Sequence, residues 1–110
     1  MPKKINQPPT KSLIFNTLYK NYDHFYSEAK PEIYKSIFEL FKEFRDKRRA
    51  RVSLSISAMI REEKWDTELI FNRDEHIVLK RDLMPFFEDM EEFELCGEIN
   101  SLYKEFTLKK

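Results

Sequence analysis

Six basic residues lie within ten positions near the middle of the chain: Lys42, Arg45, Lys47, Arg48, Arg49 and Arg51. Such a cluster attracts phosphates by Coulomb forces and counterion release, and arginine makes bidentate phosphate contacts. The same composition is typical of a solvated helix end, where cations offset the negative pole of the helix dipole. Glu43 and Asp46 dilute the positive charge. The cluster is therefore a candidate surface for a protein partner or for nucleic acid.

Five carboxylates follow closely on one another near the C-terminus: Glu88, Asp89, Glu91, Glu92 and Glu94. If they end a helix that begins at Asp82, they crowd the negative pole of its dipole, which is unfavourable. A local rule broken in this way indicates a surface where function can be sought. The segment predicts contact with a basic partner, imitation of nucleic-acid phosphates, or a solvated helix face.

The only tryptophan of the chain, Trp65, lies in the charged segment 61–66, which we expect to be a loop between two strands. Tryptophan is enriched among the residues that dominate binding interfaces, so Trp65 is a candidate anchor for a partner. The alternative is that its ring folds back over the edge of the core.

Patterns typical of catalysis and metal binding are absent from the sequence. His24 and His76 fall in no His-x-x-x-His spacing, and no Cys-x-x-Cys pair exists because Cys96 is the only cysteine. With Gly97 as its only glycine, the chain lacks the glycine-rich loops that bind nucleotide phosphates and the Gly-x-Ser-x-Gly nucleophile motif. We therefore expect no enzymatic activity, no catalytic residue, no metal and no cofactor.

Charge is unevenly distributed along the chain, although the net charge is zero. Residues 1–51 carry 12 basic and 6 acidic residues, whereas residues 52–110 carry 8 and 14. This asymmetry predicts a partner that recognises one half, or association of unlike halves of two copies. Alternatively, the two halves interleave in the fold and their charges cancel.

The start of the chain is basic, but no apolar stretch of the signal-peptide type follows it. No apolar run approaches the roughly 20 residues that span a bilayer. A cytoplasmic location without membrane contact is the simplest expectation. Residues 1–10 contain three prolines and predict a flexible basic arm, and residues 11–110 predict a single domain.

Apolar residues recur at helical spacing in two segments of the first half of the chain. Residues 12–26 predict a first helix. Residues 27–49 predict a second, longer helix, with Ser27 as its cap and Pro31 in its first turn, the part of a helix that tolerates proline.

The apolar period then changes to two, because Val52, Leu54 and Ile56 alternate with serines. This predicts a half-buried strand at 52–60. Shorter strands are expected at 67–72 and 76–80, joined by a polar loop at 73–75. Asp82 is expected to cap a third helix that ends at Gly97, and a last short helix is expected over 99–106.

The sequence thus predicts an α+β fold of order α-α-β-β-β-α-(α), with a three-stranded antiparallel meander packed against helices. If the strand at 52–60 lies at a sheet edge, it could pair with a second copy and form a homo-oligomer. Our leading hypothesis is a small non-enzymatic adaptor, inhibitor or regulator that binds a protein partner through its segregated charges. The alternatives are nucleic-acid binding through residues 42–51 and an inhibitor that mimics nucleic acid through residues 82–98.

Overall fold

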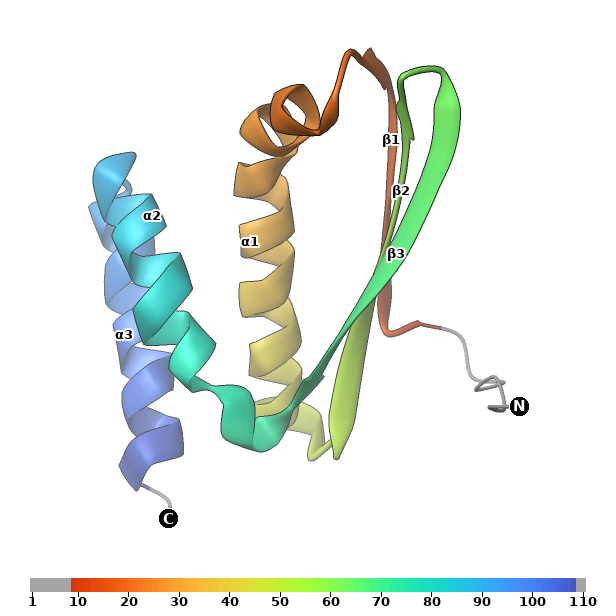
Figure 1. Ribbon diagram of the computed structural model, residues 1–110. Coiled ribbons are helices and arrows are strands. Elements are labelled where there is room, and N and C mark those ends of the chain that lie inside the picture. Colours follow the sequence, from red (N-terminus) through yellow and green to blue (C-terminus); the bar gives the residue numbers. More distant parts are fainter. Residues whose placement is uncertain (1–8, 109–110) are drawn as a thin grey trace.

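The computed structural model describes residues 9–108 (Figure 1). Within that range the elements are β1 (Lys11–Tyr19), α1 (Tyr22–Lys47), β2 (Arg51–Ile60), β3 (Glu63–Asn72), α2 (Met84–Asp89) and α3 (Phe93–Leu108). A 3₁₀ turn at Arg73–Glu75 and a π-helical turn at Leu79–Leu83 lead from β3 to α2. The predicted α+β class is confirmed, but the first described elements are a strand and one helix and not two helices.

The central strand of the sheet is β2, and the strand order is β1-β2-β3. Strand β2 pairs in parallel with β1 and antiparallel with β3. The predicted all-antiparallel meander is therefore wrong in one of its two pairings. A parallel pair needs a long crossover connection, and α1 supplies it between β1 and β2 (Figure 1).

Strand β1 occupies most of the segment for which the sequence predicts a helix. Ile14 and Leu18 have helical spacing, yet both are exposed, whereas Leu13 and Phe15 pack against the core. An apolar run this dense fits both periods, so periodicity alone does not decide between helix and strand. Pairing with β2 satisfies the backbone of β1 and decides in favour of a strand.

Helix α1 begins at Tyr22, earlier than predicted, because Asn21 caps it. The Asn21 side-chain oxygen accepts a hydrogen bond from the backbone amide of His24 at 2.8 Å. Ser27 and Pro31 therefore lie inside the helix, so both the predicted cap and the predicted first-turn proline are wrong. A proline at this position cannot donate to the carbonyl of Ser27, four residues earlier.

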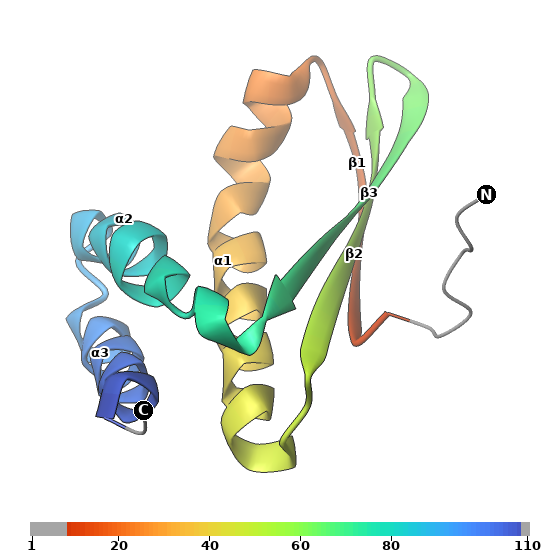
Figure 2. The same cartoon turned by 60° about the horizontal axis from the view of Figure 1, so that its bottom comes forward.

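Helix α1 lies between the sheet and the α2–α3 pair, as both views show (Figure 1, Figure 2). It is therefore buried on two sides, and the buried apolar side chains of residues 9–108 form one cluster. The predicted alternation of β2 is confirmed: alternate residues belong to this cluster, whereas the three serines and Met59 lie on the other face. The residues of β2 in the cluster are Val52, Leu54, Ile56, Ala58 and Ile60. The largest fully buried side chains are Phe25, Phe41, Phe44, Phe87, Leu40, Leu54, Leu79, Leu83, Ile99, Leu102 and Val52.

The second half of the chain differs from the prediction in five places. Strand β3 begins at Glu63, so it is longer than the predicted strand at 67–72, and residues 76–80 form no strand but enter helical turns. Asp82 lies inside the π-helical turn and does not cap a helix. Gly97 lies within α3, and the left-handed residue between α2 and α3 is Glu91, at φ 60°. Helix α3 consequently starts before the short helix predicted at 99–106.

The predicted pairing of the 52–60 strand with a second copy is excluded, because β2 has a neighbour on each side. The edges of the sheet are β1 and β3. Pairing of β1 with β2 is interrupted between Ile14 and Leu18, whereas β3 pairs with β2 without a break.

Residues 1–8 of the predicted arm lie outside the described residues. Thr10 is held to β2 by two hydrogen bonds to Ser53, of 3.0 Å and 3.2 Å. No helix within residues 9–108 is both long enough and apolar enough to cross a bilayer.

Candidate functional site

The basic cluster surrounds the C-terminal end of α1 and the start of β2, where cations offset the helix dipole. Half of its charge is already paired within the molecule. Lys47, Arg48 and Arg51 are exposed and take part in no ion pair among the residues that the structure describes. The ion pairs are Lys42 with Glu39 at 3.2 Å, Arg45 with Asp46 at 2.7 Å and with Glu105 at 3.7 Å, and Arg49 with Glu43 at 2.7 Å.

The pair of Arg45 and Asp46 is joined by a hydrogen bond as well as by charge. This hydrogen bond raises the pKa of Arg45 and lowers the pKa of Asp46. Both side chains are exposed to water, so the pair contributes little to stability. Its consequence is that Arg45 is less available to a partner than the sequence indicates.

Arg73 belongs to the same end of the molecule, and the sequence reasoning missed it. Its Nη1 donates a hydrogen bond to the backbone carbonyl of Phe44 at 2.8 Å, and its guanidinium carbon lies 5.3 Å from the centre of the Phe106 ring. Arg73 thereby satisfies a carbonyl that the end of α1 leaves without a helical donor. Nothing in the sequence linked Arg73 to the basic cluster, because only the β2–β3 pairing of Arg51 with Asn72 brings the two segments together.

The acidic segment is the junction between α2 and α3, and not the end of one helix. Glu88 and Asp89 close α2, whereas Glu92 and Glu94 lie at the start of α3. Carboxylates are favourable at a helix N-terminus, so the dipole conflict predicted for Glu92 and Glu94 is wrong.

The five carboxylates of this junction are unpaired, since no ion pair within residues 9–108 involves any of them. Two apolar side chains are exposed in their midst. Phe93 is 65% exposed and Met90 is 44% exposed. Exposed aromatic and apolar side chains among uncompensated charges are candidate contacts for a partner.

Two hollows continue the acidic junction across α1. The smaller, of about 260 Å³, lies between α1 and the start of α3 and is lined by Lys35, Phe38, Glu39, Glu92, Glu94, Leu95 and Glu98. The larger, of about 520 Å³, lies between α1 and β1 and is lined by Lys11, Leu13, Glu28, Pro31, Glu32, Lys35, Ser36 and Glu39. The hollows share Lys35 and Glu39, so the three parts form one continuous surface.

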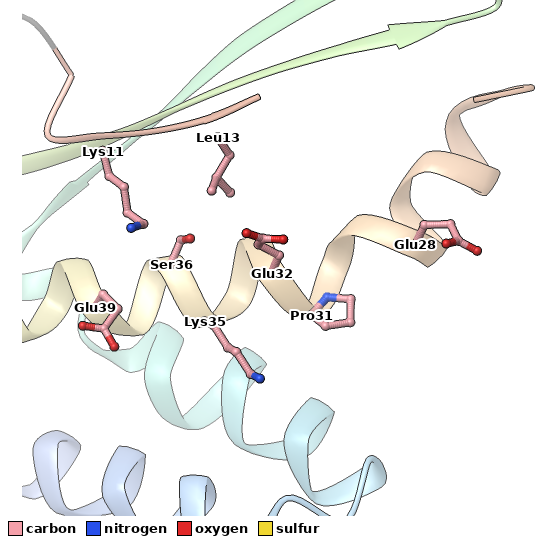
Figure 3. A pocket seen from close by; sticks show the side chains of 8 residues that line it. All are labelled: Lys11, Leu13, Glu28, Pro31, Glu32, Lys35, Ser36 and Glu39. Carbon is pink, nitrogen blue, oxygen red and sulfur yellow. The ribbon is translucent and has the colours of Figure 1, made fainter. Parts of the chain in front are cut away.

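We call this surface the acidic face. Figure 3 shows how its larger hollow is built, with Lys11 and Leu13 of β1 directed toward Glu32 and Ser36 of α1. Lys11 and Lys35 offset part of its negative charge. The sequence reasoning missed Glu28, Glu32 and Glu39, because only the fold places this side of α1 beside the α2–α3 junction. The acidic residues of the face are Glu28, Glu32, Glu39, Glu88, Asp89, Glu91, Glu92, Glu94 and Glu98.

Trp65 lies on β3 and not in the predicted loop at 61–66, because the hairpin loop comprises only residues 61 and 62. Its half-buried ring packs at the edge of the core, with centroid distances of 5.9 Å to Tyr22, 5.3 Å to Phe25 and 6.3 Å to Tyr26. This is the alternative that the sequence left open beside an anchoring role, and the anchoring role stays a prediction.

Both histidines pack against aromatic rings. The Nδ1 atom of His24 accepts a hydrogen bond from the backbone amide of Lys20 at 3.0 Å, and the His76 ring stacks on Phe106 at 5.6 Å. In the described part of the chain, no three His, Cys, Asp or Glu side chains are grouped so as to hold a metal ion.

We expect Cys96 to resist thiol reagents until the protein unfolds. Burial raises the pKa of its thiol, and the charges of Glu88 and Glu92 raise it further. Because the thiolate is the reactive form, dithionitrobenzoate should react about 100-fold more slowly with the folded protein than with the chain in urea.

The neutral thiol favours the folded state below the pKa of the unfolded thiol. This stabilisation of the folded state is lost as the pH rises through the higher pKa of the thiol in the folded protein. The protection of Cys96 from the reagent should therefore weaken between the pKa of the unfolded thiol and that of the folded thiol. The measurement is the reaction rate as a function of pH. Equal rates for the folded and the unfolded chain would contradict the burial of Cys96.

The fold and these surfaces define a small α+β protein with two oppositely charged regions. Comparison of the chain with protein-family models, with curated proteins and with solved structures gave no match. The proposals below therefore rest on the residues of the chain itself.

Proposed function

We propose that this chain is a small non-enzymatic interaction protein whose acidic face binds a basic segment of a partner protein. One observation carries the proposal. The carboxylates of the α2–α3 junction have no ion-pair partner in the described part of the chain, while Phe93 and Met90 are exposed among them. Half of the basic cluster, in contrast, is neutralised internally.

Electrostatics favours a basic occupant over any other. Carboxylates held close together repel one another, and a cationic partner relieves this repulsion and is steered to the face as it approaches. Phe93 would add an apolar contribution to binding, since an aromatic ring that becomes buried in an interface is a common source of binding free energy.

The smaller hollow suits the side chain of a lysine or an arginine. Phe38 and Leu95 offer apolar contacts for the aliphatic stem, and Glu92, Glu94 and Glu98 offer acceptors for the charged head. A partner segment with basic residues around an apolar one would therefore engage both the hollow and Phe93.

The roles that follow are those of an adaptor, an inhibitor or a regulator, and we place the protein in the cytoplasm as part of the same proposal. If the partner itself binds nucleic acid, the acidic face would act as a mimic of phosphates. Identifying what the partner itself binds would distinguish a mimic of nucleic acid from an adaptor or another kind of regulator.

The test compares two charge-reversal variants of equal size. The acidic-face variant carries Glu92→Lys, Glu94→Lys and Glu98→Lys, and the control carries Lys47→Glu, Arg48→Glu and Arg51→Glu. Affinity capture from the native host, followed by mass spectrometry and calorimetry with the purified partner, should show binding lost by about 100-fold in the first variant only. Phe93→Ala alone should weaken binding about 30-fold.

If the control loses the same partner while the acidic-face variant keeps it, the proposal is wrong. Binding to an acidic protein would also overturn it. All the reversed side chains except Glu92 are exposed, so both variants should fold, and circular dichroism of each variant checks this.

A second candidate function is nucleic-acid binding, favoured by Lys47, Arg48 and Arg51, which take part in no ion pair within residues 9–108. If all three contact phosphates, the slope of log K against log salt should be about −3, at roughly −0.9 for each phosphate. Fluorescence anisotropy with labelled DNA and RNA at several salt concentrations measures it, with the Lys47→Glu, Arg48→Glu, Arg51→Glu variant as control. Absence of binding at the lowest salt concentration would remove this candidate.

A further inference from the structure

We propose that two copies of this chain associate through β3, antiparallel and around a two-fold axis at Asp66, so that the two sheets join into one of six strands. This inference goes beyond the proposed function, because it uses neither the acidic face nor the basic cluster. The occupant of the β3 edge is a second copy of the same chain.

The β3 edge is suited to strand addition. Among the described residues it has a neighbour on one side only, and all of its residues from Glu63 to Asn72 pair with β2 in unbroken register. Exposed edges with this regularity are templates for another strand, and native proteins commonly interrupt them. The opposite edge, β1, carries such an interruption between Ile14 and Leu18.

An apolar hollow of about 300 Å³ lies beside this edge, between β3 and α1. It is the surface that a strand added to β3 would cover. Aromatic and aliphatic side chains dominate it, and its one charged residue, Lys30, lies 5.3 Å from the centre of the Tyr34 ring. The lining residues are Tyr26, Lys30, Ile33, Tyr34, Ile37, Ile56, Trp65, Thr67 and Leu69.

The charges on the outer face of β3 select the register. With the axis at Asp66, Lys64 of each copy lies directly opposite Glu68 of the other, which forms two favourable cross-strand pairs. An axis at Thr67 would oppose Asp66 with Glu68, and an axis at Glu68 would oppose that residue with itself. An axis at Leu69 would form no charge pair. An axis at Trp65 would oppose Lys64 with Asp66 but also Glu62 with Glu68, so its two attractive pairs would be offset by two repulsive ones. The register at Asp66 is therefore the favoured one.

Asp66 meets its own copy at the axis, and its carboxylate already has a partner. Its Oδ1 accepts a hydrogen bond of 2.6 Å from the Ser57 hydroxyl on β2. The bond turns the carboxylate toward the interior of its own sheet and away from the axis, which reduces the repulsion between the two copies.

The same register closes both hollows. Trp65 of each copy lies opposite Thr67 of the other, and both residues line the hollow between β3 and α1. The indole of one copy therefore lies beside the opening of the other copy's hollow. The side chains on the half-buried inner face of β3 are then shielded from water by the second copy.

Light scattering or sedimentation over a range of concentrations tests the association. We expect a monomer–dimer equilibrium with a Kd of about 10 µM. Lys64→Glu and Glu68→Lys should each weaken it about tenfold, since each replaces two attractive pairs by two repulsive ones, and the double variant should restore it. Lys104→Glu, an exposed reversal on α3, is the matched control and should leave the Kd unchanged.

Disulfide cross-linking tests the register independently. In Asp66→Cys the two thiols face each other across the axis at a Cα separation of about 5 Å, which permits a disulfide. In Glu68→Cys they are four strand positions apart, about 13 Å, which does not. Oxidation should therefore give a covalent dimer with the first variant only.

A strict monomer at every concentration would overturn the proposal, and so would a dimer that is insensitive to the charge reversals. Cross-linking of Glu68→Cys in preference to Asp66→Cys would overturn the register at Asp66. None of these outcomes depends on the acidic face, so failure here leaves the proposed function to be judged by its own experiment.

Discussion

Replacing Ile56 by lysine should prevent this chain from folding, whereas the same replacement at Ser55 should be tolerated. Ile56 is 2% exposed and lies on the central strand, facing α1. The change removes roughly 1.5–3 kcal/mol of apolar burial and places an unpaired ammonium group in the core, which costs several kcal/mol more. A typical domain is stable by only about 5–15 kcal/mol, so most or all of its stability should be lost.

Ser55 provides the matched control because it lies one residue away on the opposite face of the sheet. Its side chain is half-buried and directly opposite Glu68 on β3, so a lysine there reaches water and meets a carboxylate. Circular dichroism and amide dispersion in a nitrogen–proton correlation spectrum would compare the two variants. A folded Ile56→Lys protein, or an unfolded Ser55→Lys protein, would contradict the assignment of the two faces.

Truncating Phe41 to alanine should lower the free energy of unfolding by about 3–5 kcal/mol. The Phe41 side chain is fully buried, and its ring lies 5.3 Å from Phe44, 5.5 Å from Phe71 and 6.1 Å from Phe106. These contacts join α1 to β3 and to α3. The cavity would thus open where the sheet and the C-terminal helix meet α1, and neither layer can collapse into it without leaving the other.

Urea unfolding measures this loss, followed by circular dichroism and by the fluorescence of Trp65, the only tryptophan. Coincident transitions by the two probes would show that the sheet and the helices unfold together. Phe93→Ala is the control, because it removes the same ring from an exposed position and should change stability by no more than about 0.5 kcal/mol. A similar loss in both variants would be inconsistent with this core.

The two phenylalanine variants also separate folding from function. Phe93→Ala should retain the stability of the parent chain and lose affinity for a basic partner, whereas Phe41→Ala should lose stability. A variant that lost both would indicate that Phe93 supports the structure and is not part of an interaction surface.

Local sequence patterns predicted the helix and the strand that pack against each other in the core. Two segments of the sequence were predicted correctly: the strand pattern from Val52 to Ile60 and the helix pattern from Ile33 to Phe44. In both segments the residues that recur with the expected period are the ones that are buried in the same apolar cluster. The absence of catalytic and metal-binding spacings and the two charge clusters were also properties of the sequence alone. Those features can be predicted from the sequence because each depends only on residues that are close together in the chain.

Tertiary structure decided what depends on partners far apart in the chain. Segment 11–19 is a strand because it pairs in parallel with β2. Its own apolar residues fit both the helical period and the strand period, so they do not decide between the two. Likewise, composition shows that Arg45 is basic, but only the packing of α3 beside α1 brings it to Glu105.

The acidic face follows the same logic, since Glu28 and Glu32 join Glu92 and Glu94 on one surface only after α1 and α3 have packed together. The sequence by itself thus determined the local periods and the number of charges. The fold decided which charges are neutralised and which remain free to bind, because ion pairing depends on distances that the order of residues does not contain.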